Sequence, residues 1–221
     1  MGAVYNFTTR HNDTLDYILM CQKYEKYIVD HKANVLHAYE EFFEKKTWTD
    51  KLPEEISVED WNEALDGLKE EVINHDNSKY SDEEFEPYRR HFDKTTQEEL
   101  YDKEHPEHEE LVEQEFERAW QHHYLINPHH PEFWNYTDIQ NGALVPLNEP
   151  RKDGPRDMNL RSILHMICDW IGMTIAFRQK YSPISWYNSE AADERKSMSI
   201  KTKHTLYLIL TMLFPDEEVI E

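Results

Sequence analysis

The chain has 221 residues, 38% of them hydrophobic and 13% aromatic, which is enough to bury the core of one globular domain and excludes a disordered chain. Its 24 Lys and Arg residues stand against 45 Asp and Glu residues, and the resulting formal charge of −21 argues against binding to duplex nucleic acid. Only five glycines occur, and long stretches repeat apolar residues at helical spacing, so we predict an all-α protein.

The first predicted helix covers residues 14–43, as one long helix or two abutting ones. Residues 57–76 predict the next helix, which opens on a capping pattern formed by Ser57 and Asp60. Each helix carries a stripe that we expect to be buried: Leu15, Ile18, Tyr24, Ile28, His31, Val35 and Tyr39 in the first, and Trp61, Leu65, Leu68, Val72 and the pair His75–Asp76 in the second.

The next stretch is more polar. A short helix over residues 81–92 is expected to begin with a Ser81–Glu84 capping box and to be interrupted at Pro87. The acidic residues 93–110 predict a loop or an exposed helix.

Three more helices are predicted, over residues 109–123, 160–179 and 194–214. The prolines in "NPHHPEFW" end the first of them, because proline denies the backbone a donor. Residues 141–157 read as a loop that could cover a site as a lid. Neither a repeat nor a linker divides the chain, so we predict a single domain over residues 1–221.

Several potential metal ligands fall on the apolar faces of these helices. His31, the pair His75–Asp76, His123 and Asp169 each project from the apolar face of a different predicted helix. Burying the Asp169 carboxylate in "HMICDWIGM" without a partner would cost several kcal/mol, and a cation would offset that cost. Imidazole and carboxylate ligands suit Zn, Fe, Mn or Ni, so we predict a metal site inside a helical bundle.

Neighbouring histidines leave some choices open. Adjacent residues of a helix differ by about 100° around its axis, which favours His123 over His122 on the apolar stripe. In "NPHHPEFW" either His129 or His130 could complete a second metal position, and we favour His130, with Glu132 as a supporting partner.

One further histidine shares a face with Asp169. His165 lies one helical turn before it, and we expect His165 to donate or accept a hydrogen bond there rather than to bind the ion.

The ordered series of histidines and aspartates resembles the HD-domain superfamily of metal-dependent phosphohydrolases. The stretch "HDNSK" is similar to the HDxGK form of several branches, with Ser78 where glycine is usual. The combination of "HD-SK-EEF-PY", "AW-HH-N-HHPE-W" and "CDW" also resembles an uncharacterised HD-like family that is frequent in phages and bacteria. That second resemblance spans most of the chain and transfers no activity.

The superfamily resemblance implies roles for individual residues. His31, His75, Asp76 and Asp169 match its mononuclear ligand set. Lys79 matches the lysine that contacts substrate in HDxGK members, and Asp76 would bridge two ions in a dinuclear site.

The same resemblance implies a second ion. His123 and His130 match the two additional histidines of dinuclear members, although they lie closer together in the sequence than is usual. The expected cofactor is thus one or two divalent transition-metal ions, Fe or Mn in first place, with Zn, Ni, Co or Mg as alternatives.

The leading hypothesis is hydrolysis of a phosphate ester or anhydride on a nucleotide or other small phosphorylated metabolite. Asp76 and Lys79 would be catalytic, and Arg89 would contact the substrate, with Arg90, Arg151 and Lys152 as further candidates for outer phosphates. A mixed-valent di-iron oxygenase on the same scaffold is the first alternative. A non-enzymatic, metal-stabilised interaction protein is the second.

The partner we expect is a small anionic substrate rather than a nucleic-acid duplex or a membrane, and an oligomer is allowed. The longest apolar run, "LYLILTMLF", is too short to span a bilayer. Cys21 and Cys168 sit in apolar surroundings and are expected to be reduced. We therefore expect a cytoplasmic protein, or one of the host cytoplasm if it is encoded by a phage.

Overall fold

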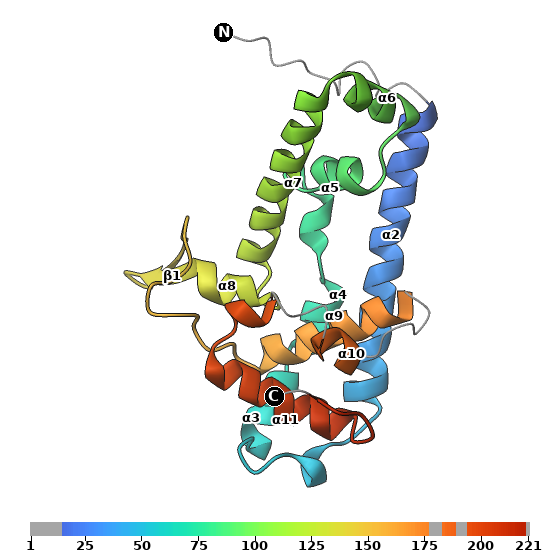
Figure 1. Ribbon diagram of the computed structural model, residues 1–221. Coiled ribbons are helices and arrows are strands. Elements are labelled where there is room, and N and C mark those ends of the chain that lie inside the picture. Colours follow the sequence, from blue (N-terminus) through green and yellow to red (C-terminus); the bar gives the residue numbers. More distant parts are fainter. Residues whose placement is uncertain (1–14, 177–182, 189–193, 220–221) are drawn as a thin grey trace. The chain divides into compact units, whose positions relative to one another are not determined.

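The computed structural model describes residues 15–176, 183–188 and 194–219, and it is mostly helical with one small hairpin (Figure 1). The α-helices are α2 (Leu15–Tyr39), α3 (Val58–Leu65), α4 (Leu68–Ile73), α5 (Phe85–Phe92), α6 (Thr96–Glu104), α7 (Pro106–Ile126), α8 (Pro131–Tyr136), α9 (Leu160–Ala176), α10 (Pro183–Asn188) and α11 (Ile200–Leu213). Shorter turns are η1 (Glu40–Glu44), η2 (Thr49–Lys51), η3 (Asn77–Tyr80) and η5 (Glu194–Ser197), and the strands are β1 (Thr137–Gln140) and β2 (Ala143–Pro146). The predicted helical fold class is confirmed.

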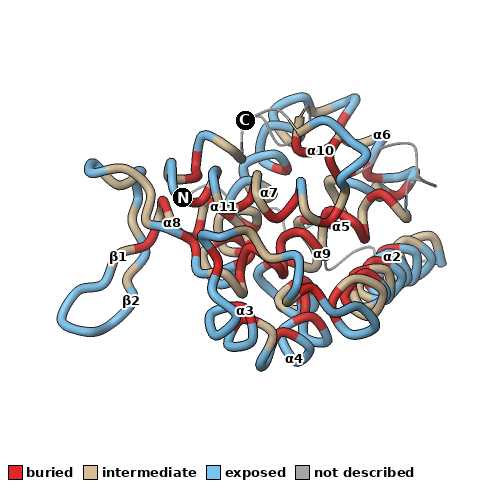
Figure 2. The backbone as a smooth tube through the Cα atoms, turned by 90° about the horizontal axis from the view of Figure 1, so that it is seen from below, coloured by how far each residue is buried: buried red, intermediate tan, exposed pale blue. Residues whose placement is uncertain are grey.

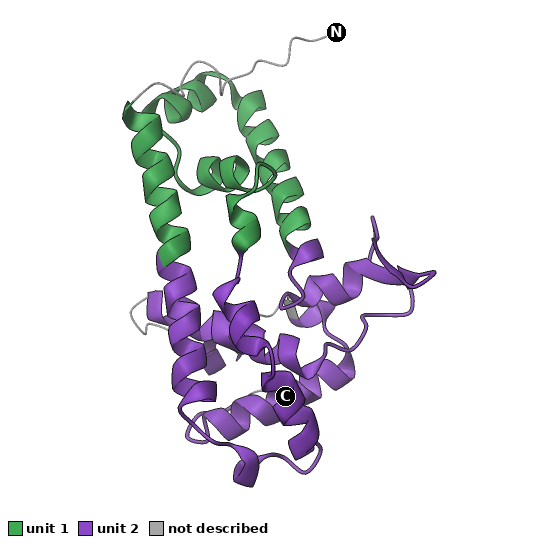
Figure 3. Ribbon diagram, turned by 180° about the vertical axis from the view of Figure 1, so that it is seen from behind, with its two compact units in different colours: residues 1–29, 77–123 green, residues 30–76, 124–221 purple. Residues whose placement is uncertain are grey.

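The chain forms two compact units, which Figure 3 distinguishes by colour. Unit 1 contains Met1–Val29 and Asn77–His123, and unit 2 contains Asp30–Asp76 and Tyr124–Glu221. Helices α2 and α7 contribute residues to both. Because each unit combines two separate stretches of chain, the predicted single domain over residues 1–221 stays a prediction.

Unit 2 is built around α9. Eleven residues of this helix are buried, and Figure 2 shows its tube mostly in the colour of buried residues. Helices α3, α4 and α10 all contact α9. An apolar helix of this kind is stable only inside a core, so α9 fixes the centre of the unit and holds Asp169 there.

Unit 1 has a smaller apolar core. Tyr24 and Ile28 of α2, Tyr88 of α5 and Ala119 of α7 form its buried cluster. Leu15 and Ile18 were expected to continue the buried stripe of α2, but they are 71% and 42% exposed. This part of the prediction is wrong: the buried stripe begins only at Tyr24.

The helix predicted over residues 57–76 is divided in two. Gly67 has φ of +84°, a left-handed backbone that favours glycine, and it separates α3 from α4. The start is as predicted, because the backbone N–H of Asp60 donates to Oγ of Ser57 over 3.0 Å. The break matters for the site, since α4 is short and ends just before His75.

The loop predicted over residues 141–157 begins with a hairpin instead. Strands β1 and β2 are antiparallel and joined at Asn141–Gly142, whose φ angles are 52° and 80°. Asn-Gly is the preferred pair for such a two-residue hairpin turn, so the signal was present in the sequence.

Two further expectations near α5 are corrected. Pro87 lies within α5 and does not interrupt it, because proline is tolerated in the first turn of a helix, where N–H groups have no partner within the helix. Glu84 does not cap this helix with its side chain. Its carboxylate binds histidines, as described below.

The last described helix is shorter than predicted. The helix predicted over residues 194–214 is interrupted, with α11 beginning after the Ser199 cap. The predicted end of the helix over residues 160–179 lies outside the described residues. Cys21 and Cys168 are free thiols, and no described helix is long and apolar enough to span a bilayer.

Candidate metal centre

The centre of unit 2 receives polar side chains from three segments. His31 belongs to α2, His75 and Asp76 follow α4, and Asp169 belongs to α9. The two long helices approach closely beside them: a Cβ atom on Gly172 would lie 2.8 Å from Cγ2 of Val35. His31 is one turn before Val35 and Asp169 is nearly one turn before Gly172, so this approach brings the imidazole and the carboxylate together.

Two ring nitrogens and two carboxylate oxygens from these segments converge. Nε2 of His31 lies 3.0 Å from Nε2 of His75 and 3.1 Å from Oδ1 of Asp169. Nε2 of His75 lies 3.4 Å from Oδ2 of Asp76 and 3.6 Å from Oδ1 of Asp169. Nε2 of His31 lies 4.0 Å from the same oxygen of Asp76.

Three of these five separations, 3.0, 3.1 and 3.4 Å, have the values expected for ligands of one cation, and the other two are longer, at 3.6 and 4.0 Å. Two ligands that each lie about 2.1 Å from an ion are about 3.0–3.4 Å apart at the usual tetrahedral or octahedral angles. Hydrogen bonds alone do not account for all these contacts. Nε2 of His31 carries at most one proton, so it can donate either to Nε2 of His75 or to Oδ1 of Asp169 but not fully to both. The donor set therefore fits a divalent transition metal.

The backbone at Asp76 is unusual. Its φ is +52°, in the left-handed region that non-glycine residues seldom adopt, although aspartate tolerates it better than most. Such conformations persist where the surrounding structure holds them, and they are common at functional sites. The turn at Asp76 lets the carboxylate and the preceding imidazole of His75 face the same point.

Burial and neighbours set the charges of this group. Burial opposes ionisation of Asp169, but the hydrogen bond from His31 and the proximity of His75 hold its pKa well below the ordinary value. Burial lowers the pKa of His75 in spite of the two nearby aspartates. The centre thus contains an ionised carboxylate and a neutral imidazole, which are the forms that bind metal ions.

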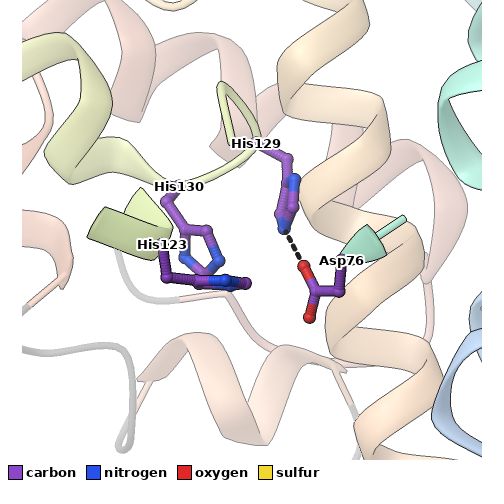
Figure 4. A group of neighbouring side chains, drawn as sticks. All are labelled: Asp76, His123, His129 and His130. Carbon is purple, nitrogen blue, oxygen red and sulfur yellow. Dashed lines mark ion pairs between the residues drawn. The ribbon is translucent and has the colours of Figure 1, made fainter. Parts of the chain in front are cut away.

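The other oxygen of Asp76 faces a second group. Figure 4 shows the imidazole of His129 directed at this carboxylate, and Nε2 of His129 lies 3.4 Å from Oδ1 of Asp76. A donor atom of His130 lies within 4.8 Å of both. The question that the sequence left open between His129 and His130 has no single answer, because both offer a donor atom to this group.

A third interaction links His75 to α9. Nδ1 of His75 lies 3.0 Å from Nε2 of His165, so His75 contacts different partners through its two nitrogens. Burial lowers the pKa of His165 to about 3, with a smaller contribution from His129. His165 is therefore a neutral partner of His75, and its donor atom also lies within 4.8 Å of donor atoms of His75 and His129. That His165 supports the ligands and does not bind the ion stays a prediction.

His123 is the last residue of unit 1 and is buried there. Its Nδ1 donates to Oε2 of Glu84 over 2.8 Å, and Nδ1 of His122 donates to Oε1 over 2.7 Å. Burial would raise the pKa of Glu84, but the hydrogen bonds from His123, His122 and Ser78 lower it. A histidine that donates Nδ1–H to a carboxylate keeps its Nε2 lone pair, an arrangement typical of metal-ligating histidines.

The two cations predicted to contact substrate are both buried in unit 1. The ammonium of Lys79 lies 6.0 Å from the ring centre of Tyr27 and 5.7 Å from that of Tyr88. The guanidinium of Arg89 is fully buried and donates to the carboxylates of Glu86 and Glu98. Arg89 thus serves the core of unit 1, and we give it no part in the proposal below.

The sequence did not single out some of the residues that shape the centre. Glu84 was read as a helix cap, and His129 was placed second to His130. Burial raises the pKa of the Glu132 carboxyl, and its Oε2 has no hydrogen-bond partner among the described residues, so its supporting role stays a prediction. The one available signal for His129 was its direct adjacency to a second histidine before Pro131.

The fold and the site define a mostly helical protein with a buried histidine–aspartate cluster that could hold one or more metal ions. A family model described as a family of unknown function, DUF5662, matches residues 20–212. The chain belongs to this family. No curated protein and no solved structure matches the chain.

Proposed function

We propose that the protein is a metal-dependent phosphohydrolase of the HD type, acting on a nucleotide or another small phosphorylated metabolite. The observation that carries the proposal is the convergence of Nε2 of His31, Nε2 of His75 and Oδ1 of Asp169, with separations of 3.0, 3.1 and 3.6 Å. With Asp76 they form the series of ligands that the sequence resemblance implies.

In this proposal His31, His75, Asp76 and Asp169 hold the first ion. The bound ion supplies a Lewis acid and a water of lowered pKa. Asp76 can serve two positions at once, because Oδ2 faces His75 at 3.4 Å and Oδ1 faces His129 at 3.4 Å. His129 and His130 are the ligands that we propose for a second ion.

A cation of unit 2 near the centre would favour an anionic substrate. Lys32 follows His31 on α2, and burial lowers the pKa of its half-buried ammonium while the charge of Asp76 opposes that shift. Lys32 is therefore a candidate for contact with the substrate in unit 2, whereas Lys79 belongs to unit 1 and its substrate role stays an implication of the sequence resemblance. Local positive charge of this kind, together with metal ions, allows a protein of charge −21 to accept a phosphate.

Elemental analysis of protein purified without a histidine tag tests the metal centre. We expect at least one equivalent of a transition metal in the wild type and little in Asp76→Asn. The control is His204→Asn, since His204 is an exposed histidine of α11 in the same unit. A wild type that binds no transition metal, even after incubation with Fe²⁺, Mn²⁺ or Zn²⁺, would contradict the proposal.

Phosphate release from a panel of nucleotides and sugar phosphates tests the chemistry. Lys79→Met keeps the length and apolar contacts of the side chain, so we expect it to retain metal and folding but to lose turnover. Metal-dependent oxygen uptake and a mixed-valent di-iron resonance signal, without phosphate release, would instead favour the oxygenase. A metal-bound protein with neither activity would favour the interaction protein.

A further inference from the structure

His75 has partners on both of its ring nitrogens. Its Nε2 faces His31, Asp76 and Asp169, whereas its Nδ1 faces Nε2 of His165 at 3.0 Å. The two imidazole rings are buried, with centroids 5.1 Å apart in an edge-to-face arrangement. In most metal sites the ring N–H of a ligating histidine that faces away from the ion donates to a carboxylate, a backbone carbonyl or a water. Here the group opposite that nitrogen is a second imidazole.

Ligation fixes where the protons of this pair must lie. If His75 binds an ion through Nε2, that nitrogen has no proton and Nδ1 carries it. Nε2 of His165 must then accept, which places the remaining proton of His165 on its own Nδ1. The direction of the whole chain of hydrogen bonds therefore follows from the metal position.

A carboxylate lies at the outer end of this chain. Oε2 of Glu71 on α4 is 3.8 Å from Nδ1 of His165, the nitrogen that has to carry the proton. Oε1 of Glu71 is 3.4 Å from Nη1 of Arg161. Arg161 in turn donates to the backbone carbonyls of Glu63 at 2.9 Å and Ala64 at 3.2 Å, which anchors it to the end of α3.

We propose that His165 is a positioning residue of the metal centre, which holds His75 in the Nδ1–H tautomer. The carboxylate of Glu71, 3.8 Å from Nδ1 of His165, favours a proton on that nitrogen by its charge. The assignment rests on the metal centre of the proposed function and goes beyond it, because His165 is not among the ligands proposed above. The inner contact is buried and close, whereas Glu71 is 43% exposed, so His165 has the larger effect and Glu71 the smaller one.

The test compares two substitutions of His165 by metal affinity, measured for Zn²⁺ by competition with a chromophoric chelator. His165→Leu removes the acceptor, and we expect about a 10–100-fold weaker affinity, the range found when such supporting partners are lost. His165→Gln places an amide oxygen near the position of Nε2, so we expect it to restore affinity to within about threefold of the wild type. Equal affinities in the wild type and His165→Leu would overturn the proposal.

Glu71→Gln tests the outer end, with Glu70→Gln as a control that removes one neighbouring exposed carboxylate from the same helix. We expect a loss of less than about fivefold for Glu71→Gln, in line with an exposed ion pair, and none for Glu70→Gln. A loss as large in Glu70→Gln would mean that only the overall charge matters, and would overturn the role of Glu71.

A readout that packing alone would not change is the tautomer itself. In the Zn²⁺-loaded wild type, histidine ¹⁵N correlation spectra should place the proton of His75 on Nδ1 and that of His165 also on Nδ1. A proton on Nε2 of His165 would overturn the proposal while leaving the metal centre intact. A wild type that binds no Zn²⁺, Fe²⁺ or Mn²⁺ would overturn both the metal centre and the role of His165, so the two failures are distinguishable.

Discussion

Both units bury carboxylates, and those that meet a Lys or Arg side chain differ from those that meet imidazoles, to which Glu84 of unit 1 also belongs. In unit 1, Glu98 meets the guanidinium of Arg89 at 2.6 Å, and Asp102 meets the ammonium of Lys94 at 2.8 Å. In unit 2, Asp76 and Asp169 meet imidazole nitrogens at 3.1 to 4.0 Å. A fixed side-chain cation completes the first kind of group, whereas the imidazoles of the second kind are side chains that can themselves bind a metal ion. Buried acids surrounded by histidines are therefore the better signal for a metal centre.

The largest effect is expected for Arg89, the buried guanidinium of unit 1. Arg89→Met leaves Glu86 and Glu98 without their guanidinium partner, and breaking a buried pair from one side costs about 3–5 kcal/mol of stability. Urea denaturation should report this loss with or without added metal. Arg118→Met, at an exposed position of α7, is the control and should change stability little. A loss of stability that changes with added metal would show that Arg89 is linked to a metal site, contrary to the difference drawn between the two units.

The next largest effect is expected for Asp169 in unit 2. Asp169→Asn keeps the shape of the side chain but removes a ligand charge. A ligand at one hundred times its dissociation constant stabilises a protein by about 2.7 kcal/mol, and the variant should lose that metal-dependent gain. Melting temperatures with and without Zn²⁺ measure it. Equal stabilisation of the variant and the wild type by Zn²⁺ would show that Asp169 is not a ligand.

A smaller effect is expected from the contact between the helices. Gly172→Ala would place a Cβ 2.8 Å from Cγ2 of Val35 and 3.0 Å from its backbone nitrogen, and such overpacking costs about 1–3 kcal/mol. It should also weaken Zn²⁺ binding, because it separates His31 from Asp169. Val35→Ala in the same chain removes Cγ2, so the double variant should be more stable than the sum of the two single effects predicts.

Between pH 7 and 6, the smallest effect is a pH dependence of stability in chelator-treated protein. His165 has a folded pKa of about 3 against 6.5 in a model compound. Between these values the unfolded chain binds more protons, so stability falls as the pH falls from 6.5 towards 3, by at most about 1.4 kcal/mol per pH unit for this group. Urea denaturation at pH 7, 6 and 5 should show a flatter profile for His165→Gln. An unchanged slope would mean that other groups cause it.

Much of the fold could be predicted from the sequence because helical periodicity is a local property. The apolar stripes around His31 in α2 and Asp169 in α9 are properties of single segments, and the two side chains are only 3% and 15% exposed. Turn chemistry is also local, and the Asn141–Gly142 hairpin was missed only because its signal was read as part of a loop.

The sequence by itself determined which residue types could form a centre: buried histidines and aspartates on apolar helix faces. Tertiary structure alone decided which of their atoms meet. The close approach of Gly172 to Val35 brings His31 to Asp169, and the left-handed backbone of Asp76 turns its carboxylate towards two groups. Periodicity gives the face on which a side chain lies, but it does not give the distance between two helices or the direction of a carboxylate, because those depend on packing between distant segments.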